Sequence, residues 1–153
     1  MIANDVLRRL RYALDLKDSA MIEMFAQGGA TVALAELEDL LKRDDQEGFA
    51  LLEDHRLDAF LDGLIAAKRG KREGPPPPPV PLNNNGILRK LKIALSFRDD
   101  DVIDALKLAN FRISKSELSA FFRQRGHPNY RECGDQVVRN FLQGLASQLR
   151  RQG

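Results

Sequence analysis

The sequence contains a single cysteine, no tryptophan and no long apolar run. With Cys133 alone the chain cannot form an internal disulfide, which is typical of a protein kept in a reducing compartment. No segment approaches the roughly 20 consecutive apolar residues that span a bilayer. Arg8, Arg9 and Arg11 interrupt the first apolar segment, so it has no signal-peptide core. We therefore expect a cytoplasmic protein that does not enter the membrane.

Motifs for common chemistries are also missing. The sequence has no glycine-rich nucleotide loop, zinc framework or nucleophile elbow. It predicts neither a cofactor nor a metal, and it favours a protein that is not an enzyme. With 43% hydrophobic and 30% charged residues, the composition is that of a globular protein.

What the chain does have is an internal repeat. Residues 4–14, NDVLRRLRYAL, return 81 positions later as residues 85–95, NGILRKLKIAL, and the match continues without a gap. About a quarter of the paired positions are identical, which is typical of a duplicated structural unit. We divide the chain into a first repeat at 1–70, a linker at 71–84 and a second repeat at 85–153.

Apolar residues recur at helical spacing four times in each repeat. We therefore predict an all-α protein with two pseudo-symmetric helical repeats of about four helices each, joined by a proline-rich linker. Asn4 is expected to cap a first helix over 5–16, and Asp18 and Asp99 to cap the second helix of each repeat. Ser114 and Glu117 match a capping box at the start of a third helix.

Gly63 and Gly144 lie inside the predicted fourth helices, where glycine costs about 1 kcal/mol relative to alanine. Their presence in both repeats predicts a neighbouring backbone too close for a β-carbon. Between the repeats, Pro75 to Pro79 predict a semi-rigid polyproline spacer, although such segments also serve as ligands for aromatic-lined grooves.

The two halves have opposite charge. Residues 1–74 hold 11 Lys/Arg and 15 Asp/Glu, a net charge of −4, whereas the remainder holds 13 and 7, a net charge of +6. Such polarity is typical of nucleic-acid contact by the basic half. It is also explained by attraction between the halves, within one molecule or head to tail between molecules, and we favour this interpretation because it requires no ligand.

The outer faces of the two predicted first helices share a pattern in which a basic pair stands beside one apolar side chain. We interpret this face as a candidate contact surface, against the alternative that it is merely solvated. The candidate residues for binding a protein partner are Arg8, Arg11, Tyr12, Arg89, Lys92 and Ile93.

The second and third helices, with the short turn between them, resemble a helix-turn-helix motif. This resemblance suggests nucleic-acid binding as a second hypothesis. In the second repeat the candidate residues are Lys115, Ser119, Arg123, Arg125 and Arg131. The first repeat carries Glu38, Asp39 and Asp44 in this region, which a duplex would repel. At most one repeat could therefore bind nucleic acid in this way.

The loop before the last helix holds the densest group of reactive side chains, His127, Cys133 and Asp135. They could form a nucleophile and its base, or half a metal site. A structural zinc needs four ligands, however, and the first repeat has Gln46 and Leu52 at the places of His127 and Cys133. A buried cysteine acting as a small apolar residue is the favoured interpretation.

The stretches NDVLRRLRYAL, FLDGLIAAKRGK, NNGILRKLKIA and the region from Arg131 to Ala146 resemble the bacterial YehS-like family, a group of unknown function built from two repeats. The resemblance covers nearly the whole chain. It implies a compact helical protein of the bacterial cytoplasm and supplies no reaction, cofactor or catalytic residue. Our leading hypothesis is therefore a non-enzymatic interaction or regulatory protein that binds a protein partner or self-associates.

Overall fold

The structure is a computed structural model that describes residues 1–71, 73–75, 78 and 80–152. Eight α-helices and no strand occur in these residues, which confirms the all-α prediction with four helices in each repeat. The first repeat contains α1 (Ala3–Leu14), α2 (Asp18–Gln27), α3 (Leu34–Leu40) and α4 (Asp54–Arg69). The second contains α5 (Asn84–Ala94), α6 (Asp99–Leu108), α7 (Lys115–Phe121) and α8 (Asp135–Gln152).

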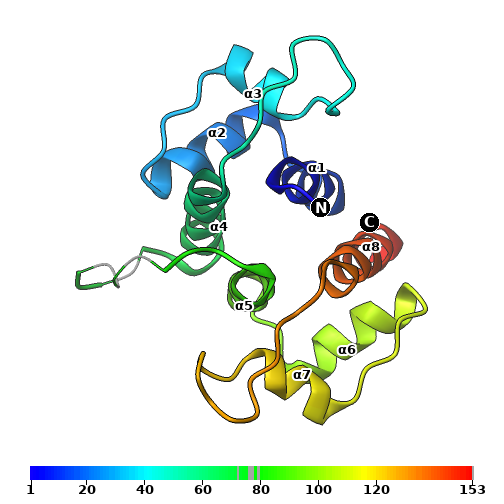
Figure 1. The fold of residues 1–153 in the computed structure, drawn as a ribbon. Helices are drawn as coiled ribbons and strands as arrows, with labels where there is room; N and C mark the ends of the chain where they lie inside the picture. Colours follow the sequence, from blue (N-terminus) through cyan, green and yellow to red (C-terminus); the bar gives the residue numbers. More distant parts are fainter. Residues whose placement is uncertain (72, 76–77, 79, 153) are drawn as a thin grey trace.

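The helices are arranged with approximate twofold symmetry (Figure 1). α1, α4, α5 and α8 surround the centre and are seen roughly end on, while α2 with α3 and α6 with α7 lie at opposite sides. A half-turn in the plane of the picture exchanges α1 with α5, α2 with α6, α3 with α7 and α4 with α8. The pseudo-symmetry axis therefore runs along the central helices.

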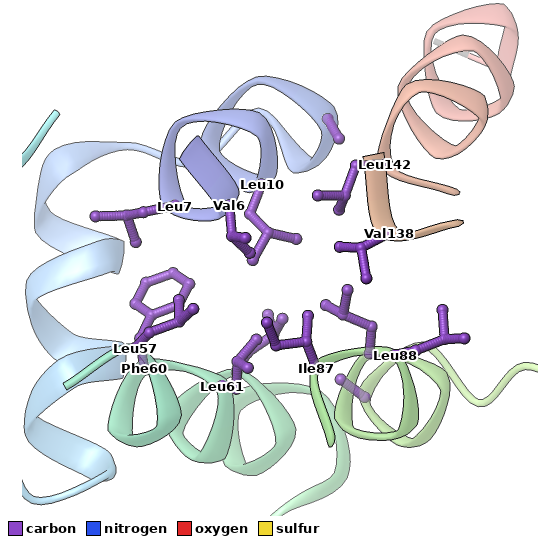
Figure 2. Packing of buried hydrophobic residues seen from close by; sticks show 14 of the residues in the cluster. Val6, Leu7, Leu10, Leu57, Phe60, Leu61, Ile87, Leu88, Val138 and Leu142 are labelled. Atoms are coloured by element: carbon purple, nitrogen blue, oxygen red, sulfur yellow. The ribbon is translucent and has the colours of Figure 1, made fainter. Parts of the chain in front are cut away.

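The two repeats pack directly on each other. α1 lies against α8, and the equivalent pair, α4 and α5, forms a second seam. Side chains from all four helices point into a shared interior, among them Val6, Leu61, Ile87 and Val138 (Figure 2). The buried apolar residues form one continuous cluster that includes both repeats. This explains how halves of such small size bury enough surface to fold, since a unit of this length has little core of its own.

The two glycines predicted to allow close packing do so. A β-carbon added at Gly63 would lie 1.7 Å from the carbonyl oxygen of Met24 on α2, and one added at Gly144 would lie 1.7 Å from that of Ala105 on α6. No real β-carbon approaches a backbone atom so closely, so the α2–α4 and α6–α8 contacts both depend on glycine. The equivalent contact in each repeat confirms the helix-packing prediction.

The helix ends agree with the sequence in part. Ser114 Oγ accepts from the Glu117 N–H at 3.1 Å and Glu117 Oε1 accepts from the Ser114 N–H at 3.2 Å, which confirms the capping box. The caps expected at Asp18 and Asp99 are wrong. Both are the first helical residues, and Lys17 and Arg98 precede them as extended N-cap residues. The two carboxylates still lie in the first turn, where the helix dipole favours negative charge.

Asn4 was also expected as a cap, and this is wrong. The N-cap of α1 is Ile2, and Asn4 lies fully buried within the helix. Pro76, Pro77 and Pro79 lie outside the described residues, so the polyproline spacer remains a prediction.

Candidate functional site: two basic hollows

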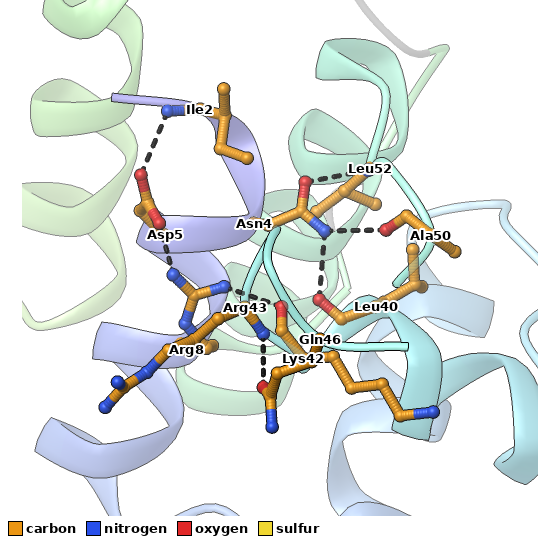
Figure 3. A network of polar contacts seen from close by, with 10 residues as sticks. All are labelled: Ile2, Asn4, Asp5, Arg8, Leu40, Lys42, Arg43, Gln46, Ala50 and Leu52. Atoms are coloured by element: carbon orange, nitrogen blue, oxygen red, sulfur yellow. Dashed lines mark hydrogen bonds and ion pairs between the residues drawn. The ribbon is translucent and has the colours of Figure 1, made fainter. Parts of the chain in front are cut away.

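Asn4 and Asn85, the buried polar residues among the described ones, hold the loop between the third and fourth helices of each repeat. Asn4 Nδ2 donates to the carbonyls of Leu40 (3.0 Å) and Ala50 (2.8 Å), and its Oδ1 accepts from the Leu52 N–H at 2.9 Å (Figure 3).

Asn85 makes the same three bonds. Its Nδ2 donates to the carbonyls of Phe121 (3.0 Å) and Arg131 (2.8 Å), and its Oδ1 accepts from the Cys133 N–H at 2.9 Å. These clamps fix the chain that follows α3 and α7 against the first turn of α1 and of α5.

Two open hollows lie next to these clamped segments, one over each first helix. The α5 hollow has a volume of about 370 Å³ and is lined by Arg69, Arg89, Lys92, Ile93, Ser96, Phe97 and Phe122. The α1 hollow has a volume of about 670 Å³ and is lined by Arg8, Arg11, Tyr12, Asp15, Leu16, Lys17, Asp18, Leu41 and Arg150.

All seven lining residues of the α5 hollow have an equivalent in the α1 hollow at the repeat distance of 81. Six of the pairs lie in the first three helices and their connections. The seventh crosses between repeats, because Arg69 of α4 completes the α5 hollow and Arg150 of α8 completes the α1 hollow. Each hollow is therefore completed by one arginine of the other repeat.

In the α1 hollow the three arginines are held in defined positions. Arg8 Nη1 donates to the Lys42 carbonyl at 2.9 Å, and its Nη2 pairs with Asp5 (Figure 3). Arg11 forms an ion pair with Asp18 at 3.0 Å. The guanidinium carbon of Arg150 lies 3.9 Å from the centre of the Tyr12 ring, and Nη2 donates to the Tyr12 carbonyl at 3.1 Å.

The α5 hollow has three cations equivalent to these arginines, and its walls are more apolar than those of the α1 hollow, which also contains Lys17, Asp15 and Asp18. Arg89 Nη2 donates to the Phe122 carbonyl at 2.6 Å, and Arg69 Nη1 donates to Ser96 Oγ at 2.6 Å. Lys92 Nζ pairs with Asp99 at 2.5 Å and lies 4.4 Å from the centre of the Phe122 ring. In the described part of the chain no carboxylate lies within ion-pair distance of Arg69 or Arg89.

The cations of the hollows are kept in both repeats although the charge of other positions inverts. Arg8, Arg11 and Arg150 correspond to Arg89, Lys92 and Arg69. By contrast, Asp44 and Asp58 of the first repeat correspond to Arg125 and Arg139. Positive charge at the hollows is therefore a property of the repeated unit and not of the basic half alone.

All six residues proposed from the sequence as partner contacts line these hollows. Tyr12 is 59% exposed and Ile93 is 43% exposed, so neither belongs to the core. Sequence reasoning missed Arg69 and Arg150. Their match at the repeat distance was visible, but their place beside the other repeat's first helix depends on how the repeats pack.

The nucleic-acid candidates are divided between a helix and a loop. Lys115 and Ser119 lie on α7, a helix of seven residues, while Arg123, Arg125 and Arg131 lie in the following loop. All but Ser119 are exposed. Lys115 Nζ lies 3.3 Å from Asp100, one of three aspartates in the first turn of α6. A duplex approaching α7 would meet these carboxylates.

Cys133 and His127 are not joined by a hydrogen bond. Cys133 is buried, and burial together with Asp135 raises the pKa of its thiol to about 12, so it stays protonated near neutral pH. Its Sγ lies 3.6 Å from the Gly134 carbonyl. His127 is exposed, and its Nδ1 accepts from the Asn129 N–H at 3.0 Å. Thiolate chemistry requires the opposite environment, an exposed and electropositive one.

A metal cluster and a membrane-spanning helix are both absent from the described residues. These residues contain no group of three or more His, Cys, Asp or Glu side chains that could hold a metal ion. Nor does any of their helices combine the length and apolar character that crossing a bilayer requires.

Comparison with known proteins agrees with the repeat. The family model described as "Protein of unknown function (DUF1456)" matches residues 3–70 and 84–151. The uncharacterized protein YehS of Escherichia coli (strain K12) is 41% identical over 149 residues, which cover 96% of each chain. No solved structure matches this chain. The chain therefore belongs to the DUF1456 family.

Proposed function

We propose that the protein is a non-enzymatic interaction protein that binds a protein partner through the α1 and α5 hollows. The observation that carries the proposal is the recurrence of the three hollow cations in both repeats, while the charge of other positions inverts.

The chemistry of the hollows suits a polypeptide that carries carboxylates. Each arginine presents five N–H donors and uses one or two of them within the chain, so donors remain for a ligand. Arginine and aromatic side chains are enriched where proteins bind one another. Tyr12 and Ile93 supply exposed apolar surface beside the charges.

The test is capture of partners from a lysate of the source cell by the tagged full chain, followed by mass spectrometry. The variant carries Tyr12→Glu and Ile93→Glu, which add negative charge at both hollows without touching the core. The control is Leu51→Glu, because Leu51 is 62% exposed and lines neither hollow. We expect proteins bound by the wild type and the control to be lost from the double variant.

Unfolding curves of all three proteins would establish that they are equally folded. The proposal would be contradicted by an unchanged set of captured proteins in the double variant. The proposal would also be contradicted if the wild type captured no protein that beads without the chain do not capture.

A second candidate, nucleic-acid binding by the second repeat, is favoured by the exposed loop residues Arg123, Arg125 and Arg131. Titration of labelled DNA and RNA at several salt concentrations tests it, since phosphate contacts are strongest at low salt. Binding that weakens with salt and in an Arg123→Glu/Arg125→Glu variant would support this function. Absence of binding at low salt would remove it.

A further inference from the structure

The two hollows open toward the same end of the molecule. At the start of α1 and α8, the Met1 amino group lies 2.9 Å from Asp135, and at their ends Arg150 donates to the Tyr12 carbonyl. α1 and α8 therefore run in the same direction.

The other seam has the same geometry. Lys90 in the middle of α5 pairs with Asp58 and Asp62 of α4, and Arg69 at the end of α4 donates to Ser96 just beyond α5. Because the half-turn axis runs along these helices, the symmetry also keeps α1 and α5 parallel (Figure 1). Both hollows lie at the C-terminal ends of these helices, so a half-turn about one axis exchanges them.

The walls of the hollows distinguish between anionic partners. A phosphate backbone would use the cations but would gain nothing from Ile93, Phe97 and Phe122, which lie beside them in the α5 hollow. Tyr12, Leu16 and Leu41 take the equivalent places in the α1 hollow. A peptide with one large apolar side chain between acidic residues would use both kinds of surface.

Building on the proposed function, we propose that the hollows bind two copies of one acidic peptide segment, presented by a single homodimeric protein. The twofold axis of that partner would coincide with the half-turn axis of this chain. A symmetric dimer presents two identical segments related by a twofold axis. This single chain has two equivalent hollows related in the same way. Engaging both hollows at once makes the second contact intramolecular, which raises the overall affinity.

The experiment compares one and two copies of a probe by fluorescence polarisation and calorimetry on the full chain. The single probe is a short fluorescein-labelled peptide with one phenylalanine flanked by glutamates. The double probe joins two copies through Gly/Ser linkers of about 10, 20 and 40 residues, because the gain depends on matching the span. A peptide with lysines in place of the glutamates is the charge control.

We expect two single probes to bind each chain, and one double probe to bind at least about tenfold more tightly at the best linker length. Tyr12→Glu or Ile93→Glu alone should leave one single-probe site and abolish the linker-dependent gain. Leu51→Glu should change neither quantity. The lysine control should not bind.

Each alternative result has a distinct meaning. Single-probe binding at both hollows with no gain at any linker length would overturn the homodimeric occupant and leave the interaction function intact. Equal binding of the lysine control, or no binding of either acidic probe, would overturn the acidic occupant. Loss of captured proteins in the double variant would still support the proposed function.

Discussion

At the scale of single residues, the best-defined features are polar or small side chains buried for a structural purpose. Asn4 and Asn85 each bond to the carbonyl of the last residue of a helix and to one carbonyl and one N–H of the loop after it. A buried backbone group left without its hydrogen bond costs about 1–3 kcal/mol, so each asparagine stabilises its loop strongly.

We expect Asn4→Ala and Asn85→Ala each to lower the free energy of unfolding by about 2–4 kcal/mol, because each loses three hydrogen bonds that are buried or partly buried. Urea denaturation followed by circular dichroism measures this. Asn129→Ala, in an exposed loop, is the matched control and should change stability by less than about 0.5 kcal/mol. A loss as small as the control's for either buried asparagine would contradict the clamp.

Cys133 should react slowly with thiol reagents in the folded protein. Its pKa of about 12 leaves a far smaller thiolate fraction than a free cysteine with a pKa near 8.5 has. At pH 8 we expect the reaction with Ellman's reagent to be at least about 10³-fold slower than in urea-unfolded chain. Equal rates would show that the thiol is exposed, and Cys133 would then again be a candidate catalytic nucleophile.

At the scale of helices, the fold depends on two close crossings made possible by glycine. Gly63 brings α4 onto α2, and Gly144 brings α8 onto α6. Alanine would ordinarily favour a helix by about 1 kcal/mol, but here its methyl group would overlap a backbone carbonyl. The steric cost should exceed the gain in helix propensity.

We predict that Gly63→Ala and Gly144→Ala each destabilise the protein by about 2 kcal/mol or more, since the helices must separate. Gly134→Ala is the control, because a β-carbon there meets nothing within 4 Å. Thermal unfolding of the three variants would measure the difference. Unchanged or raised stability of Gly63→Ala or Gly144→Ala would show that the α2–α4 and α6–α8 contacts leave room for a methyl group.

Features that depend on local sequence could be predicted, whereas features that depend on packing between distant residues could not. Helix number, the Ser114 capping box and the glycine crossings depend on local spacing or on the repeat, so they were predictable. The role of Asn4 could not be predicted, because an asparagine before an apolar stripe resembles a helix cap in sequence. Its actual partner, the loop at Leu52, is distant in the sequence and is brought close only by the fold. Arg150 beside Tyr12 likewise depends on packing between repeats.

At the scale of the whole molecule, the two seams are equivalent in shape and different in charge. Lys90 of α5 pairs with Asp58 (2.5 Å) and Asp62 (2.7 Å) of α4 across one seam. At the other seam the equivalent of Lys90 is Arg9, and the two aspartates are replaced by Arg139 and Gln143. Ion pairs between side chains of the two central helices therefore form at the α4–α5 seam, whereas the ion pair at the α1–α8 seam joins the Met1 amino group to Asp135.

Burial opposes the charged form of Lys90, but hydrogen bonds and attraction from Asp58 and Asp62 outweigh it and raise its pKa above the ordinary value near 10.5. A raised folded pKa means that the stabilisation is fully present below the unfolded pKa and is lost as pH rises through the folded one. We expect Lys90→Met to cost about 1 kcal/mol at pH 7. Wild-type stability should approach that of the variant as the pH rises through the raised pKa of Lys90.

Arg9→Met is the matched control at the other seam. Arg9 is exposed and forms no ion pair with any carboxylate in the described residues, so stability should change by less than about 0.5 kcal/mol. Urea denaturation at low and high salt would compare the two variants. Equal effects would mean that charge does not distinguish the seams.

The equivalence of the seams has a consequence for the origin of the chain, because each seam joins a first helix of one unit to the last helix of the other. A single ancestral unit could have formed the same assembly as a homodimer before gene fusion. Residues 1–70 alone would place Arg9 opposite Asp58 and Asp62 at both junctions, whereas residues 84–152 alone would place Lys90 opposite Arg139. Sedimentation of the two fragments should therefore find the first one dimeric at concentrations where the second is not, since like charges oppose its pairing.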